Sequence, residues 1–95
     1  MENKRIIDKL TSDGALFRCQ GILECIDKDI KDPEVINAVS QLKDDKVIVL
    51  GRRVSTWART ALDVLGVEAY IGDDEEVLDF IRDMKRYLEQ NDRVY

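Results

Sequence analysis

The sequence contains no histidine, only two cysteines and only one tryptophan among its 95 residues. The lack of histidine removes the commonest general base and the commonest metal ligand, and it excludes an ordinary serine triad. Cys19 and Cys25 lie six positions apart in one expected helix, so they point in different directions and we expect no disulfide between them. We therefore expect a protein that is not an enzyme and that holds no metal or cofactor.

Long apolar runs are also missing. The longest uncharged apolar run, residues 47–51, is far too short to cross a bilayer, and the N-terminal residues do not have the pattern of a signal peptide. Twenty acidic residues against 15 basic ones give a net charge of −5, which disfavours duplex nucleic acid because such binding depends on neutralising phosphates. These features predict one domain over residues 1–95, a cytoplasmic location, no membrane contact, and a basic or neutral protein partner.

The spacing of apolar residues predicts five helices, over about 2–10, 15–27, 33–42, 54–65 and 75–90, and an all-α fold. Asp32 and Pro33 form a start signal, Ser12 or Asp13 is expected to cap the second helix, and Asp73 or Asp74 the fifth. Residues 91–95 are expected to fray. The expected inward faces are Ile6, Ile7 and Leu10; Ala15, Leu16, Cys19, Ile22, Leu23 and Ile26; Val35, Ile36, Val39 and Leu42; and Val77, Leu78, Ile81, Met84 and Leu88, with Phe80 beside the last face.

The fourth helix carries the clearest pattern in the chain. Apolar or small residues fall at 54, 57, 58, 61, 62 and 65, and Gly66 supplies a stop because glycine enters the left-handed region without steric cost. A valine, two alanines, a leucine and a closing glycine at these offsets resemble the second helix of a HEAT-type repeat. The resemblance implies two antiparallel helical pairs plus a terminal helix, and a scaffold that binds other proteins.

Weak internal repetition agrees with that resemblance. Apolar positions of residues 32–42 match those of 74–84 at a separation of 42, and those of 15–26 match 54–65 at a separation of 39. A period near 40 is in the HEAT and armadillo range. Because the last helix has no partner in this scheme, self-association into a homo-oligomer is a further expectation.

A competing interpretation concerns residues 46–72. Residues 46–51 and 67–72 are rich in β-branched residues, so with the helix between them they could form a βαβ unit of a small α/β domain. Such a unit could bind a ligand at the helix N-terminus near Gly51. However, the segment supplies only two strands, which is too few for a stable sheet, and a single glycine does not make a phosphate-binding loop.

The candidate binding residues surround the single tryptophan. Arg52, Arg53 and Arg59 flank Trp57, and arginine and tryptophan are the residues most enriched at interface hot spots. Alternatively, Trp57 completes the apolar stripe and the arginines are solvated, which its position on the same face as Ala61 favours.

The acidic clusters are explained most simply by helix capping. Residues 44–45 and 73–76 lack the spacing and glycine turn of a calcium-binding loop. The favoured function is therefore a non-enzymatic protein–protein interaction module of HEAT-like type. The first alternative is a small α/β ligand-binding or regulatory domain. An enzyme ranks lowest, although HEAT-like folds include phycobilin lyases and DNA glycosylases.

Overall fold

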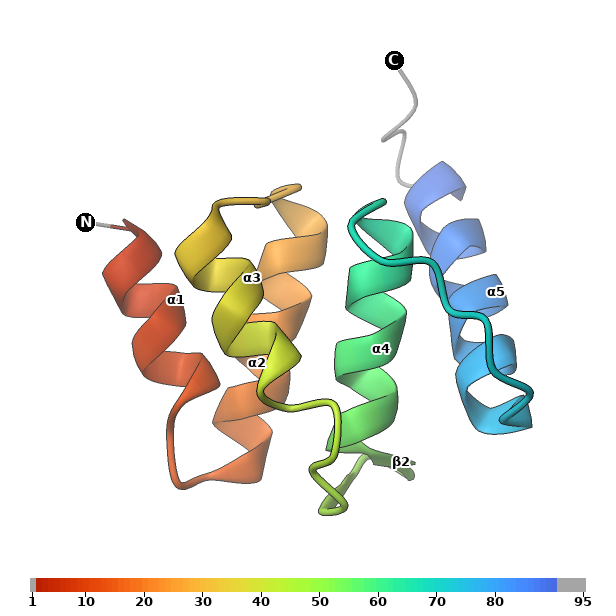
Figure 1. Cartoon of the computed structure of the whole chain (residues 1–95), viewed down its shortest axis with the longest axis horizontal. Coiled ribbons are helices and arrows are strands. Elements are labelled where there is room, and N and C mark those ends of the chain that lie inside the picture. Colours follow the sequence, from red (N-terminus) through yellow and green to blue (C-terminus); the bar gives the residue numbers. More distant parts are fainter. Residues whose placement is uncertain (1, 91–95) are drawn as a thin grey trace.

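The computed structural model describes residues 2–90, which form five helices and one short hairpin (Figure 1). The elements in chain order are α1 (Glu2–Leu10), α2 (Ala15–Asp27), α3 (Pro33–Ser40), β1 (Ile48–Val49), β2 (Arg52–Arg53), α4 (Val54–Val64) and α5 (Glu75–Gln90). The predicted all-α class with about five helices is confirmed. The third helix ends at Ser40, and residues 41–44 form turns in place of its expected last residues.

The first four helices form two antiparallel pairs. Figure 1 shows α1 running opposite to α2, and α3 opposite to α4. In addition, α1 packs beside α3, and α2 packs beside α4, so the two pairs share one interior. This is the arrangement that the sequence predicted for these four helices.

The fifth helix is not unpaired, because α5 packs along α4. It runs in the same direction as α4, since residues 65–74 first return along the whole length of α4 (Figure 1). Successive helices in stacked hairpins alternate in direction, so α5 does not continue the pattern of the first two pairs. The HEAT resemblance and self-association both stay predictions.

The alternative βαβ unit over residues 46–72 is wrong. The only strands among the described residues are β1 and β2, which pair antiparallel with Ile48 opposite Arg53 and Val49 opposite Arg52. Leu50 and Gly51 form the two-residue turn between them, and both have positive φ (54° and 83°). Residues 67–71 form no strand, because the chain crosses α4 there as an irregular segment.

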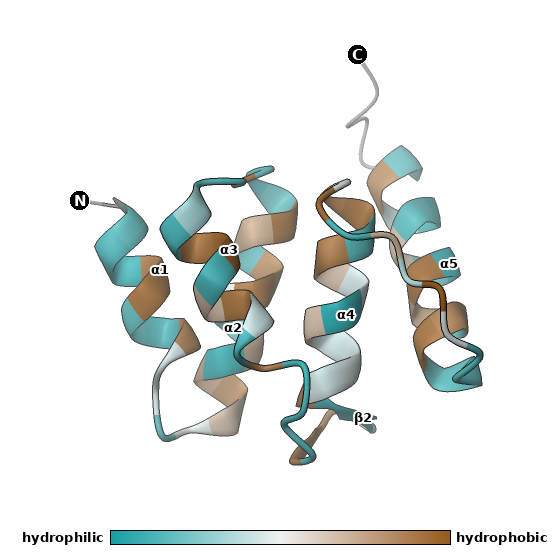
Figure 2. Ribbon diagram, viewed as in Figure 1, coloured by the Kyte–Doolittle hydropathy of each residue, from teal (hydrophilic) through white to brown (hydrophobic). Residues whose placement is uncertain are grey.

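The core is built around α4, which packs on α2, α3, α5 and β2. All six positions of its predicted stripe are buried. Figure 2 shows apolar and polar stretches on every helix, as one-sided burial requires. In the middle of α2, Gly21 lets α1 approach closely, since a Cβ there would lie 3.1 Å from the Leu10 side chain.

Two predicted core residues lie at the surface. Leu16 is 50% exposed and Leu78 is 43% exposed, whereas Cys25 and Phe80 are buried. The buried residues of α5 are those at positions 77, 80, 81 and 84, which form one stripe along the helix. The side chain at position 78 lies beside this stripe and is therefore exposed. In α2 the buried face is centred between Cys19 and Cys25, which turns Leu16 outward.

The helix ends follow the sequence signals in part. Gly66 has φ of 75°, and the N–H groups of Gly66 and Val67 donate to the carbonyls of Asp63 and Leu62, which closes α4 as predicted. At the start of α5, the Glu76 N–H donates to the Asp74 carboxylate at 3.0 Å, so the predicted Asp74 cap is confirmed.

The other two predicted caps differ. Gly14, rather than Ser12 or Asp13, precedes the first residue of α2, and no side chain caps that helix. Asp32 does precede α3, but its carboxylate accepts a hydrogen bond from the Asn3 amide and none from the helix. The long-range contact to α1 has replaced the local one.

Candidate functional site

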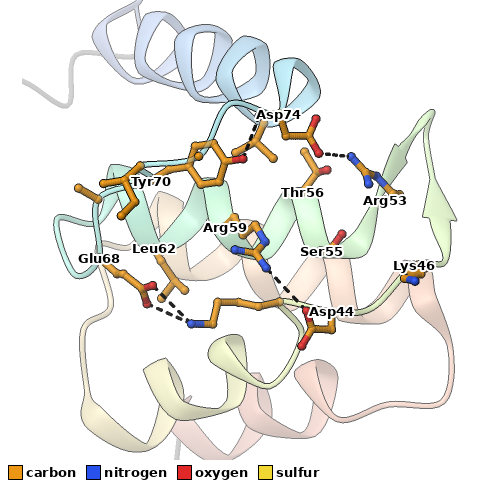
Figure 3. Close-up of a pocket in the computed structure, with 15 residues that line it drawn as sticks. Asp44, Lys46, Arg53, Ser55, Thr56, Arg59, Leu62, Glu68, Tyr70 and Asp74 are labelled. Atoms are coloured by element: carbon orange, nitrogen blue, oxygen red, sulfur yellow. Dashed lines mark hydrogen bonds and ion pairs between the residues drawn. The ribbon is translucent and has the colours of Figure 1, made fainter.

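A groove of about 480 Å³ lies between α4, the stretch before β1 and the segment that joins α4 to α5 (Figure 3). Its charged lining residues are Lys43, Lys46, Arg53 and Arg59, with Asp44, Glu68 and Asp74. Cations outnumber acids in this lining, although the whole chain has a net charge of −5. The groove is therefore locally more positive than the protein that contains it.

The floor of the groove is the polar side of α4. The floor residues share one side of the helix, because each follows the previous one by one or three positions: Ser55, Thr56, Arg59 and Leu62. The chain before β1 packs against the start of this helix. There the Ser55 N–H donates to the Asp45 carbonyl at 2.7 Å, which fixes the 43–46 stretch beside the floor.

The far wall is the irregular segment 66–74, which hydrogen bonds hold at its middle and at its last residue. The Tyr70 N–H donates to the Asp63 carboxylate of α4 at 2.9 Å, and the Asp74 N–H donates to the Tyr70 hydroxyl oxygen at 3.1 Å. Gly72 leaves room for the Tyr70 ring, because a Cβ at Gly72 would lie 2.4 Å from the tyrosine oxygen. The segment therefore keeps a defined path over α4 without forming a helix or strand.

One end of the groove is closed by a carboxylate network. Glu76 accepts hydrogen bonds from the Thr56 hydroxyl and from the Nε of Arg53, at 3.0 Å for the latter, and Arg53 also bonds Asp74 at 2.6 Å. The Thr56 hydrogen bond, followed by those of Arg53, lowers the pKa of Glu76. The Arg53 hydrogen bond likewise lowers the pKa of Asp74, and both carboxylates raise the pKa of Arg53. This network joins the first turns of α4 and α5.

The cations at the rim are held more loosely. Lys43 contacts Glu68 at 3.3 Å, and Arg59 contacts Asp44 at 3.7 Å, with the Asp44 side chain 97% exposed. Such exposed pairs contribute little, about 0–1 kcal/mol. Lys46 has no ion-pair partner within the described part of the chain. Lys46 and Arg59 are therefore available to a ligand.

A second, apolar depression of about 300 Å³ lies on the opposite side of α4. Trp57 and Phe80 meet there edge to face, with ring centroids 5.0 Å apart, and Leu23, Met84 and Tyr87 complete the apolar lining. At its edge, the guanidinium carbon of Arg52 lies 4.1 Å from the centre of the Phe80 ring.

The four residues singled out in the sequence do not form one patch. Trp57 is only 7% exposed, and its indole N–H donates to the Val49 carbonyl at 3.3 Å, so it belongs to the core. Arg52 lies on the apolar side, over Phe80, whereas Arg53 and Arg59 line the groove. The arginine that stacks on an aromatic ring does so on Phe80 and not on Trp57.

Sequence reasoning missed several groove residues, namely Lys46, Ser55, Thr56 and Tyr70. One signal was present: Ser55, Thr56 and Thr60 stand among the apolar positions of a central helix, and all three are buried. Buried hydroxyls need partners, so their number on one helix pointed to a polar site beside it. The path of residues 66–74 over α4 had no such signal.

The structure gives little support to a reactive thiol or a metal site. Burial raises the pKa of both cysteine thiols to about 11, so they are protonated near neutral pH. They are free and buried, and no disulfide links them. Among residues 2–90, no group of three or more cysteine, aspartate or glutamate side chains is placed to hold a metal ion.

Comparisons with known proteins give no assignment. No family profile, curated protein or solved structure matches this chain. Within the described residues, no helix combines the length and apolar character that crossing a membrane requires.

Proposed function

We propose that this protein is a non-enzymatic module that binds an extended segment of another protein in the groove along α4. The proposal keeps the function that the sequence favoured and moves its site. Arg53 and Arg59 remain part of it, whereas Trp57 and Arg52 belong to the opposite side of the helix.

The carrying observation is a set of three unpaired backbone N–H groups in the far wall. Within the described residues, the N–H groups of Ala69, Ile71 and Gly72 donate no hydrogen bond. Extended protein segments bind elsewhere by adding main-chain hydrogen bonds to unpaired backbone groups, typically at a sheet edge, and side-chain pockets then give specificity. The mixed polar and apolar lining of the groove suits a peptide better than a purely apolar ligand.

The side chain of Ile71 supports the same proposal. It is 96% exposed, the largest exposed fraction among the large apolar side chains described. It lies next to Tyr70 on the groove wall, where a partner can cover it. The partner segment is therefore expected to bring an apolar side chain to Ile71 while its backbone pairs with residues 69–72.

The titratable groups give little support to an enzyme. A general acid needs a raised carboxyl pKa, but Asp74 in the groove and Glu76 beyond its end have lowered pKa values and are bound to Arg53. No histidine exists to serve as a base.

The proposal is tested by selecting short random peptides on the immobilised protein and mapping their binding by backbone NMR shifts. We expect shifts at residues 69–72 and loss of binding in Ile71→Asp, which cannot desolvate the partner side chain. Leu16→Asp makes the same change at an exposed leucine of α2 and is the matched control.

Two results would contradict the proposal. One is equal loss of binding in both variants. The other is a set of shifts confined to Leu23, Phe80 and Met84, which would place the binding surface in the apolar depression.

A further inference from the structure

We infer that Lys46, Ser55 and Arg59 form a binding site for an oxyanion, a carboxylate or phosphate group, inside the groove. The inference goes beyond the proposed function, because a free anion can occupy this site without any protein segment. It names a ligand class and the three side chains that would hold it.

The hydroxyl of Ser55 is the first observation. Ser55 lines the groove, and its hydroxyl makes no hydrogen bond within the described residues. The residue as a whole is 9% exposed, but its hydroxyl oxygen is not among the fully buried atoms without a partner, so it is open to the solvent in the groove. The neighbouring hydroxyl of Thr56 donates to Glu76, whereas the Ser55 hydroxyl donates to no described residue and can donate to a ligand in the groove.

The two loosely held cations line the same groove as this hydroxyl. Arg59 is one helical turn after Ser55, so the two side chains share one side of α4. Lys46 directly follows Asp45, whose carbonyl accepts the Ser55 N–H. Figure 3 shows Ser55 between Lys46 and Arg59, with Asp44 paired to Arg59.

The nearby acids do not cancel this charge. The Asp45 carboxylate contacts the Arg18 Nε at 3.0 Å and accepts the Val47 N–H at 3.1 Å, so it is occupied. Asp74 is occupied by Arg53. The exposed Asp44 is the one acid that an incoming anion must displace from Arg59.

The N-terminus of α4 adds a favourable electrostatic field, but few of its backbone N–H groups are free to donate a hydrogen bond. The positive end of the helix dipole favours an anion near Ser55. The first two helical N–H groups, those of Val54 and Ser55, already donate to carbonyls of Val47 and Asp45. The side chains, rather than the helix amides, therefore make the site.

Inorganic phosphate is the probe, titrated into the protein at constant ionic strength with backbone NMR as the readout. We expect saturable shifts at Ser55 and Thr56. Lys46→Gln, Arg59→Gln and Ser55→Ala should each weaken binding about tenfold, the usual effect of losing one hydrogen bond to a charged group. Lys4→Gln, an exposed lysine on α1, is the matched control and should bind phosphate unchanged.

Shifts that grow without saturation would overturn the inference, and so would equal weakening by Lys4→Gln and Lys46→Gln. Because Lys46 is exposed, its variant reports on binding even if Ser55→Ala disturbs the fold. A phosphoserine peptide is titrated in parallel. Tighter binding than phosphate identifies a protein segment as the source of the anion, and equal binding identifies a free anion. If the protein does not bind phosphate but still selects peptides, the oxyanion site is refuted and the proposed function is unaffected.

Discussion

Thr56 and Thr60 lie one turn apart on α4, and both are fully buried, but their hydroxyl groups differ. The Thr56 hydroxyl donates to Glu76, whereas the Thr60 hydroxyl has no partner among the described residues. A buried hydroxyl without a partner loses its hydrogen bonds to water and gains none in return. The two residues therefore form a natural pair for comparison.

We predict that Thr60→Val raises the free energy of unfolding by about 1 kcal/mol, because valine has a similar shape and no unsatisfied hydroxyl. Thr56→Val should lower it by a similar amount, since Glu76 loses a donor. Urea denaturation measures both. A change of the same sign in the two variants would contradict the assignment of their hydroxyl groups.

The lowered pKa of Glu76 makes the stability of the folded protein depend on pH. Its pKa is lower in the folded protein than the ordinary 4.5, so the folded state binds this proton more weakly than the unfolded state. The resulting stability is present above about pH 4.5 and is lost as the pH falls through the folded-state pKa. Glu24 and Asp74, whose pKa values are also lowered, act in the same direction.

We predict that the free energy of unfolding falls from about pH 5 to about pH 3, and that Glu76→Gln makes this fall smaller without abolishing it. Glu89→Gln, an exposed change at the other end of α5, is the control and should leave the fall at its original size. Denaturation curves across this pH range check both expectations. Identical pH dependence of Glu76→Gln and the unmodified protein would show that the network is not electrostatically coupled to folding.

At the scale of elements, the sequence predicted helices well and the connections poorly. The periodic stripe of α4 and the signals at Pro33 and Gly66 are local, so they could be recognised without the fold. The β1–β2 hairpin has only two residues in each strand and a Leu-Gly turn, which is too little for a recognisable pattern. The outward positions of Leu16 and Leu78 depend on which helices pack beside them, and no local pattern contains that information.

The hairpin turn gives a prediction of its own. Leu50 adopts a φ of 54° and is largely exposed, so its side chain adds strain without packing. Leu50→Asn should raise the free energy of unfolding by about 1 kcal/mol, because asparagine tolerates the left-handed region and Asn-Gly is the favoured pair for this turn. Leu50→Ala keeps the strain and should change little. Thermal unfolding of the two variants tests this, and equal stabilisation by both would contradict it.

At the scale of the whole molecule, α4 separates two surfaces of different chemistry. The groove exists because residues 66–74 return along α4 and are anchored at Asp63, whereas the apolar depression lies where α5 packs on the opposite side. Sequence reasoning found in α4 the clearest helical pattern of the chain and named Arg53 and Arg59 as binding candidates. It could not place them on the groove, because that depends on contacts between residues more than 20 positions apart, such as Arg53 with Asp74 and Glu76.

The most direct test of the account is amide hydrogen exchange at residues 69–72, with and without a selected peptide. We predict fast exchange at Ala69, Ile71 and Gly72 in the free protein, because these N–H groups have no acceptor among the described residues, and slowed exchange when the peptide binds. Slow exchange in the free protein, or protection that appears only around Phe80 and Met84 of α5, would contradict the assignment of the groove as the binding site.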